Sequence, residues 1–232
     1  MSELLKINNL WGGYKEGVDI LRGISMDVQQ GEAVGIIGLN GSGKSTFGKA
    51  IMNMIPIRKG KILLEGEDIT AFSTSELSHR GISIMQQGGK MFRNLSVWDN
   101  LQLAGQGRST QLADMIPLLQ RPKKELGHMM ADKLSGGQKH QLSLAMTLAT
   151  NPRLVILDEP SAGLSPKAVE EMYEILRDVR AKLNVTILLI EQNISKAVDF
   201  CHWSILIQQG KIAKRIVGNN INEIEIIMFN KV

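Results

Sequence analysis

The chain has few cysteines and histidines and no long apolar run, which argues against a disulfide-linked, zinc-binding or membrane-spanning protein. It contains a single cysteine, Cys201, in 232 residues, which excludes an internal disulfide and fits a reducing compartment. Its four histidines have no clustered cysteine partners, which argues against a structural zinc site. Continuous apolar runs are far shorter than the ~20 residues that cross a bilayer. No basic segment followed by an apolar run opens the chain, so we expect no signal peptide.

An excess of one charge is also lacking. Lysine and arginine total 27 against 23 acidic residues, which leaves a net charge of +4. This excess is too small for the basic stripe of a nucleic-acid-binding protein, so we expect no nucleic-acid partner. Hydrophobic residues make up 43% of the chain, enough to bury a core. We therefore expect a single domain over residues 1–232, with a small inserted subdomain.

A glycine-rich segment at residues 38–45, GLNGSGKS, fits the pattern G-x-x-x-x-G-K-[ST] of phosphate-binding loops. The apolar run before it, residues 32–37, predicts a buried parallel strand. Residues 44–54 have helical apolar spacing and are closed by Pro56. The loop therefore joins a strand to a helix, where backbone N–H groups and the helix N-terminus can hold a phosphate. These flanks make a plain glycine-rich turn with a solvated lysine a poor alternative.

Two side chains of this loop, and two acidic residues far downstream, are suited to phosphate chemistry. Lys44 would reach the β- and γ-phosphates of a nucleotide, and the Ser45 hydroxyl would bind Mg²⁺. The apolar run 154–157 predicts a second buried strand, which ends at Asp158 and Glu159. Ligands bind beyond the carboxyl ends of parallel strands, so these carboxylates are expected to meet the phosphate loop. Asp158 would hold Mg²⁺ through water and Glu159 would polarise the attacking water, unless the pair only ends the strand.

A third segment, LSGGQ at residues 134–138, precedes a stretch with helical apolar spacing, residues 136–150. The Ser-Gly-Gly turn would open that helix and offer free N–H groups to an anion. Together with the phosphate loop and the Asp-Glu pair, this segment resembles the signature motif of the ATP-binding subunits of ABC transporters. The resemblance covers the chain from about residue 4 to about residue 217. It implies that ATP held by one chain meets the signature of a second chain, so that dimerisation belongs to the mechanism.

The order of strands and helices predicts the fold class. Their alternation indicates an α/β protein with a mainly parallel sheet, and residues 24–28 alternate as an antiparallel edge strand does. Ser73 and Glu76 have capping-box spacing at the start of a short helix. The resemblance adds that this is a P-loop nucleotide hydrolase core with an antiparallel N-terminal β part. It also implies a short inserted helical subdomain over approximately residues 88–150.

The resemblance also assigns residues that the motifs alone do not. Tyr14 takes the place of the aromatic residue that stacks on adenine, with Trp11 as the alternative. Gln87 takes the place of the glutamine that senses Mg²⁺ and water, with Gln86 as the alternative. Residues 161–165, SAGLS, correspond to the loop that contacts the second chain of the dimer.

The complete set of expected site residues divides by role. The catalytic residues are Lys44, Glu159 and Gln192, and Mg²⁺ is held by Ser45, Gln87 and Asp158. The residues expected to bind ATP are Tyr14, Gly38, Leu39, Asn40, Gly41, Ser42, Gly43, Lys44, Ser45 and Thr46. The signature residues that act on the nucleotide of the second chain are Ser135, Gly136, Gly137 and Gln138.

Two positions depart from the family pattern. Most members have a histidine that contacts the γ-phosphate where this chain has Gln192, in the sequence IEQN. Glutamine can donate a neutral hydrogen bond but cannot carry the positive charge of an imidazolium. Met146 stands in the signature helix where an arginine is common. Either change could slow hydrolysis, although Lys44, Asp158 and Glu159 are all present.

The resemblance implies an ATPase that drives a membrane transporter from the cytoplasmic face of the cell membrane, with ATP and Mg²⁺ as cofactors. The segments SAGLSP and IEQN are most similar to the ATP-binding subunits of branched-chain amino-acid uptake systems. The expected partners are a membrane-spanning permease subunit and a second ATP-binding subunit, in a heterodimer or alternatively a homodimer. The chain itself would not touch the transported substrate. The alternatives are a soluble ABC ATPase of a non-transport complex, or a weakly catalytic partner of a sister subunit.

Two apolar segments have no role in the ATP site. Met91 and Phe92 follow the flexible pair Gly88-Gly89 and either dock against the membrane subunit or fold into the helical subdomain. The tail, residues 221–232, is apolar enough to pack against the chain or to meet a partner.

Overall fold

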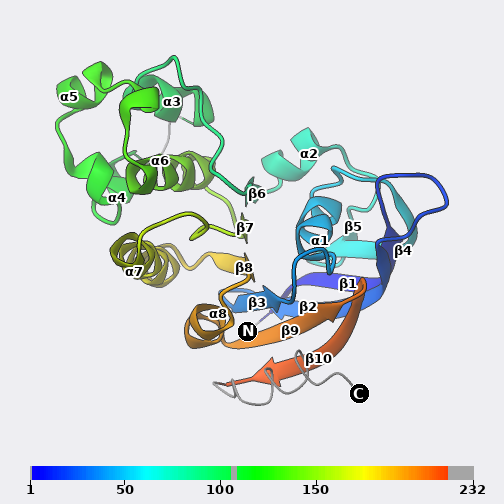
Figure 1. Cartoon of the computed structure of the whole chain (residues 1–232). Helices are drawn as coiled ribbons and strands as arrows, with labels where there is room; N and C mark the ends of the chain where they lie inside the picture. Colours follow the sequence, from blue (N-terminus) through cyan, green and yellow to red (C-terminus); the bar gives the residue numbers. More distant parts are fainter. Residues whose placement is uncertain (1, 106–108, 219–232) are drawn as a thin grey trace. The chain divides into compact units, whose positions relative to one another are not determined.

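The computed structural model describes residues 2–105 and 109–218, which fall into two compact units (Figure 1). The first unit joins the N-terminal segment Met1–His79 to the C-terminal segment Thr186–Val232, and the second is Arg80–Val185. The expected single domain over residues 1–232 stays a prediction. The apolar tail at residues 221–232, for which packing or a partner is expected, lies outside the described residues.

The first unit begins with an antiparallel sheet of strand order β2-β1-β4-β5. Strand β1 lies at its centre and pairs with β2 on one side and β4 on the other. Strand β2 lies at an edge and alternates between buried and exposed residues, as expected from its sequence. The strands are β1 (Glu3–Gly12), β2 (Leu21–Gln29), β4 (Ile57–Leu64) and β5 (Glu67–Asp68).

The short helix α2 (Thr74–His79) follows this sheet and has the predicted N-terminal cap. The Ser73 backbone N–H donates to Glu76 Oε2 at 2.8 Å, and the Glu76 N–H donates to Ser73 Oγ at 3.3 Å. In the nearby turn, the Thr70 hydroxyl and backbone N–H both donate to Asp68 and lower the pKa of its carboxyl to about 2.

The parallel part of the first unit carries the phosphate loop. Strand β3 (Ala33–Ile37) lies between β8 (Thr186–Glu191) and β9 (Trp203–Gln208) and is parallel to both. Every residue of β3 and β8 is buried, as in parallel strands that are covered on both faces. Strand β10 (Lys211–Val217) closes this part as an antiparallel edge.

Two helices belong to this part, α1 (Lys44–Ile51) and α8 (Ile194–Phe200). Helix α1 starts where the sequence predicts but ends before residue 54. Asn53 adopts a left-handed conformation, with φ of 50°, and its side-chain amide donates to the Phe72 carbonyl at 2.7 Å. This side chain-to-backbone contact replaces the next helical turn, a competition that apolar spacing does not report.

The second unit combines two parallel strands with a group of helices, drawn in green and yellow in Figure 1. The strands are β6 (Ile82–Met85) and β7 (Leu154–Asp158). The helices are α3 (Val97–Ala104), α4 (Ser109–Ala113), η1 (Pro117–Gln120), α5 (Lys123–His128), η2 (Ala131–Lys133), α6 (Gly136–Ala149) and α7 (Pro166–Leu183). The helical subdomain expected near residues 88–150 stays a prediction as a domain, although α3 to α6 lie within it.

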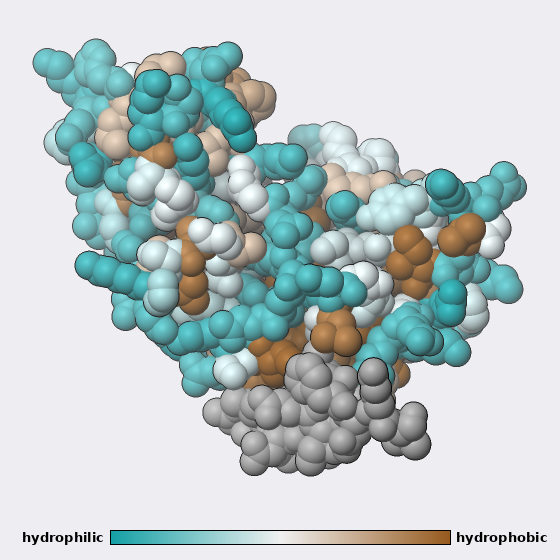
Figure 2. Space-filling view, viewed as in Figure 1, coloured by the Kyte–Doolittle hydropathy of each residue, from teal (hydrophilic) through white to brown (hydrophobic). Residues whose placement is uncertain are grey.

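Together the two units confirm the predicted fold class, an α/β protein with parallel and antiparallel sheets. Hydrophilic residues dominate the surface shown in Figure 2, and apolar residues form small separate groups there. Within residues 2–105 and 109–218, the helices lack the length and hydropathy of a membrane span.

Candidate functional site

The phosphate loop joins β3 to α1 in the first unit, as predicted. Lys44 is buried, and its Nζ donates to the Gly38 carbonyl at 2.9 Å and to the Leu39 carbonyl at 3.1 Å. The ammonium group is therefore held over the loop by the backbone of the loop itself. Gly43, in a left-handed conformation with φ of 110°, precedes the helix and has no side chain to cap it. The N-terminus of α1 is thus suited to an anion.

A tight turn between β9 and β10 supports the loop from the other side. The Gly210 N–H donates to the Ser42 carbonyl at 2.9 Å, and the Gly210 carbonyl accepts from the Arg22 N–H at 2.8 Å. A Cβ atom at residue 210 would lie 1.7 Å from the Ile20 carbonyl oxygen, so only glycine fits there. Gly210 could not be predicted from the sequence, because its partners lie far away in the chain.

The structure favours Tyr14 over Trp11 as the exposed aromatic residue. Tyr14 is 51% exposed, and Lys49 Nζ of α1 lies 5.6 Å from its ring centroid. Trp11 is half-buried in the central strand β1, and its Nε1 donates to Asn9 Oδ1 at 2.9 Å. The adenine-stacking role of Tyr14 stays a prediction, and Tyr14 is the more exposed of the two aromatic residues.

Gln192 leaves the same sheet edge as the phosphate loop. Ile37 and Glu191 are register partners at the ends of the parallel strands β3 and β8, so the residues after them emerge side by side. Gln192 is exposed, and its backbone N–H donates to Glu191 Oε2 at 3.1 Å. The same carboxylate oxygen accepts from the Asn193 N–H at 3.5 Å. The buried Glu191, which sequence analysis missed, therefore shapes the loop that carries Gln192.

The second unit brings Gln87 and Glu159 together. Strands β6 and β7 are parallel, with Met85 opposite Leu157, and both residues lie just beyond their ends. Gln87 Nε2 donates to Glu159 Oε2 at 2.6 Å. Asp158 and Glu159 are 3% and 6% exposed. Gln87 is therefore the glutamine whose side chain is seen to bond to Glu159, and the Gln86 carbonyl accepts from the Gly89 N–H in the turn that follows.

The signature forms the start of α6 as predicted. Ser135 caps the helix through a reciprocal pair of bonds, from the Gln138 N–H to Ser135 Oγ at 3.3 Å and from the Ser135 N–H to Gln138 Oε1 at 3.0 Å. Gly136 and Gly137 supply the other backbone N–H groups of this first turn. They line a pocket of about 570 Å³, which Ser165, the N-cap of α7, also lines. Two helix N-termini therefore open into one pocket, an arrangement suited to an anionic group.

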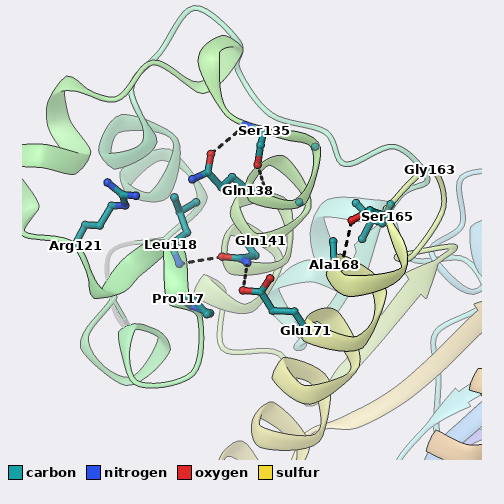
Figure 3. A pocket seen from close by; sticks show the side chains of 13 residues that line it. Pro117, Leu118, Arg121, Ser135, Gln138, Gln141, Gly163, Ser165, Ala168 and Glu171 are labelled. Atoms are coloured by element: carbon teal, nitrogen blue, oxygen red, sulfur yellow. Dashed lines mark hydrogen bonds between the residues drawn. The ribbon is translucent and has the colours of Figure 1, made fainter.

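A buried glutamine holds the walls of this pocket together (Figure 3). Gln141 Oε1 accepts from the Leu118 N–H at 2.9 Å, and Gln141 Nε2 donates to Glu171 Oε1 at 3.0 Å. Figure 3 shows Gln141 between these two partners, which come from η1 and α7. This contact, too, could not be predicted from the sequence, because it joins three segments that are separate in the chain.

An exposed apolar residue lies on the loop after Gln87. Phe92 is 56% exposed, whereas Met91 is half-buried. The loop is shaped by Asn100, whose Oδ1 accepts from the Phe92 N–H at 2.8 Å and whose Nδ2 donates to the Phe92 carbonyl at 3.0 Å. Asn100 is completely buried, so it holds the backbone of Phe92 while the ring stays in solvent. Docking of this loop on a partner stays a prediction.

The expected site residues divide between the two units. The phosphate loop, Tyr14 and Gln192 belong to the first unit, and Gln87, Asp158, Glu159 and the signature belong to the second. The expected meeting of the carboxylates with the phosphate loop therefore stays a prediction. Within each unit, the structure brings together the residues that the motifs place at the ends of neighbouring parallel strands.

A phosphate loop between a parallel strand and a helix, in an α/β fold, defines the class of the P-loop nucleotide-binding ATPases. Residues 21–162 match the ABC transporter family, and the chain belongs to that family. It is an ATP-binding subunit of an ABC transporter and an ATPase. Subunits of this kind dimerise and work with membrane permease components.

Several relatives resemble the chain over almost its whole length. The "Probable branched-chain amino acid transport ATP-binding protein LivF" of Archaeoglobus fulgidus is 32% identical over 226 residues, covering 96% of this chain and 95% of that protein. The lipopolysaccharide export system ATP-binding protein LptB of Acidithiobacillus ferridurans is 32% identical over 222 residues, covering 91% and 89%. The ADP conformation of MJ1267, an ATP-binding cassette of an ABC transporter, is 25% identical with a TM-score of 0.84, covering 100% and 96%.

Proposed function

We propose that the chain powers the uptake of branched-chain or other hydrophobic amino acids through a separate membrane-spanning subunit, at the cytoplasmic face of the cell membrane. The similarity to LivF, over 96% of this chain and 95% of that protein, carries this proposal. The similarity to BraG of Pseudomonas aeruginosa, a high-affinity branched-chain amino acid transport ATP-binding protein, supports it at 30% identity. The similarly placed LptB makes lipopolysaccharide export the competing function to be tested.

The residues of each unit have a defined part in ATP hydrolysis. Lys44 neutralises charge on the β- and γ-phosphates, and Tyr14 stacks on the adenine. Water attacks the γ-phosphorus, the bond to the bridging oxygen of ADP breaks, and Glu159 takes the proton of the water. The hydrogen bond from Gln87 orients the Glu159 carboxylate at 2.6 Å. Gln192 donates a neutral hydrogen bond to the γ-phosphate.

The expected metal fits the donors that the chain offers. Ser45, Gln87 and Asp158 provide hydroxyl, amide and carboxylate oxygens, which suit a hard cation such as Mg²⁺. Gln87 uses its amide nitrogen toward Glu159, so its oxygen is the atom that would face the metal. When bound, Mg²⁺ supplies positive charge to the β- and γ-phosphates.

Gln192 leads us to propose a heterodimer. A composite site uses the phosphate loop and residue 192 of one chain and the signature of the other. In a homodimer residue 192 would be glutamine in both sites, and both sites would lack the imidazole contact. A sister subunit with a histidine at this position would give one fully equipped site and one weaker site.

Uptake measurements test the substrate class. In cells that lack the chain, uptake of labelled leucine should fall, and the native chain but not Lys44→Ala should restore it. Methionine uptake distinguishes branched-chain from other hydrophobic amino acids, because methionine import proteins also resemble the chain at 31% identity. Unchanged leucine and methionine uptake, together with a loss of lipopolysaccharide export, would show that the substrate class is wrong while leaving the ATPase assignment intact.

A further inference from the structure

A buried histidine connects the signature helix to the loop that carries Glu159. His140 is 7% exposed, and its Nδ1 lies 2.6 Å from the carbonyl oxygen of Pro160. A carbonyl oxygen can only accept, so Nδ1 carries the proton and donates. Pro160 directly follows Glu159, and the contact therefore fixes the peptide next to the proposed catalytic base.

The backbone at Glu159 needs such support. Its φ of 50° lies in the left-handed region, which costs a non-glycine residue free energy and persists only where its surroundings hold it. The side chain of Glu159 is held by Gln87, and the peptide after it is held by His140. Both contacts therefore help to fix the position of the carboxylate.

His140 also belongs to the helix that begins at the signature. It lies little more than one turn after the N-cap Ser135 on α6, a continuous helix of 14 residues. A helix this short moves as a rigid element, so a displacement of its N-terminus moves His140 with it. The Ser-Gly-Gly turn and the position of Glu159 are thus joined through one helix and one hydrogen bond.

We propose that His140 is a positioning residue that couples the two ATP sites of the dimer. This inference rests on the proposed function, in which the signature of a chain serves the nucleotide of its partner while Glu159 serves its own. ATP seated against the signature would hold α6 in place, and His140 would then hold Glu159 in its productive position. His140 acts through Pro160 and touches no nucleotide.

Two substitutions at residue 140 separate this role from simple packing. His140→Leu fills the buried space but removes the donor. His140→Asn shortens the side chain but keeps an N–H donor on the atom that corresponds to Nδ1, because both nitrogens are bonded to Cγ. Thr147→Ala is the matched control. It removes one hydrogen bond from the same helix, from the Thr147 hydroxyl to the Ser143 carbonyl, and does not involve Pro160.

The measurement is the ATPase rate against ATP concentration for the full chain assembled with its partner subunits, with hydrolysis at the sister subunit's own site inactivated so that the rate reports turnover at Glu159. The native complex should hydrolyse ATP with a Hill coefficient above about 1. In His140→Leu, kcat should fall about tenfold, as expected for one buried hydrogen bond, and the Hill coefficient should approach about 1. His140→Asn should recover most of both values, and Thr147→Ala should match the native chain. Nucleotide affinity at the phosphate loop of the isolated chain should stay unchanged in all variants.

Some results would overturn the inference without touching the proposed function. These are a non-cooperative native complex, or an active His140→Leu complex with native kcat and Hill coefficient. Failure of His140→Asn to recover activity while its melting temperature equals that of the native chain would also refute it, since packing alone would then explain the residue. By contrast, a native complex without ATPase activity would refute the proposed function itself.

Discussion

Replacing Glu159 with glutamine tests whether this residue has the proposed catalytic role or only a structural one. The carboxamide has nearly the shape of the carboxylate, and its oxygen can still accept from Gln87 Nε2, a bond of 2.6 Å in the native chain. It cannot accept the proton of the attacking water. The variant should therefore keep its fold and bind ATP but hydrolyse it slowly, which would trap ATP in a stable dimer.

The expected loss of ATPase rate is large and the expected change in stability is small, so the two can be distinguished. Loss of a general base costs about 10²–10⁴-fold in rate, or about 3–5.5 kcal/mol in the activation free energy. The free energy of unfolding changes through two opposing effects. The hydrogen bond from Gln87 becomes neutral and weakens by about 1 kcal/mol, while removal of a charge that is only 6% exposed lowers its desolvation cost. The net change in melting temperature should stay within about 4 °C.

Three measurements on the same preparation check this reasoning. They are steady-state ATPase activity, equilibrium ATP binding, and the oligomeric state with and without ATP. Glu174→Gln, an exposed carboxylate on α7 in the same unit, is the matched control and should behave as the native chain. Full ATPase activity in Glu159→Gln would refute the assignment of Glu159, and loss of ATP binding would show that the residue acts structurally.

Three other predictions concern the remaining parts of the site. Lys44→Ala should abolish nucleotide binding, measured at equilibrium, because it removes the buried cation of the phosphate loop; native affinity would contradict this role. Gln192→His should raise the ATPase rate of the chain by up to about a hundredfold, measured alone and with the sister subunit. If the native chain alone already hydrolyses ATP at the full rate of the transporter and Gln192→His does not change that rate, the two ATP sites do not differ in activity as proposed. A cross-linker at Met91, beside the 56% exposed Phe92, should capture a membrane subunit in intact cells. One at Val18, which is 54% exposed, should not. No capture at Met91 would argue against docking.

The parts of the fold that could be predicted from the sequence are those fixed by local pattern. The strand before the phosphate loop is an uninterrupted apolar run that ends at a glycine, and Ser73 and Glu76 are close enough in sequence to cap a helix without help from elsewhere. The predicted end of α1 is wrong, because Asn53 bonds to Phe72, a residue outside the helical pattern.

The site residues that could not be predicted from the sequence share one property: each bonds to a partner in another part of the chain. Gly210 bonds to Ser42, and His140 bonds to Pro160. Each contact depends on the packing of separate elements, which neither periodicity nor a motif encodes. The motifs predict the groups that we propose to act on a nucleotide, whereas the residues that hold those groups in position could be found only in the structure.

The contacts of Glu191 explain how the loop can carry glutamine at residue 192, where most family members have histidine. The buried Glu191 carboxylate accepts from the backbone N–H groups of Gln192 and Asn193, and the Asn193 side chain accepts from the Lys196 N–H at 3.1 Å to cap α8. The loop is thus shaped by bonds to backbone atoms, which do not depend on the side chain at residue 192. Because β8 ends beside β3, that side chain emerges next to the phosphate loop whatever its identity. Histidine and glutamine are therefore alternatives on one support, and we expect their exchange to change the charge offered to the γ-phosphate while leaving the loop conformation in place.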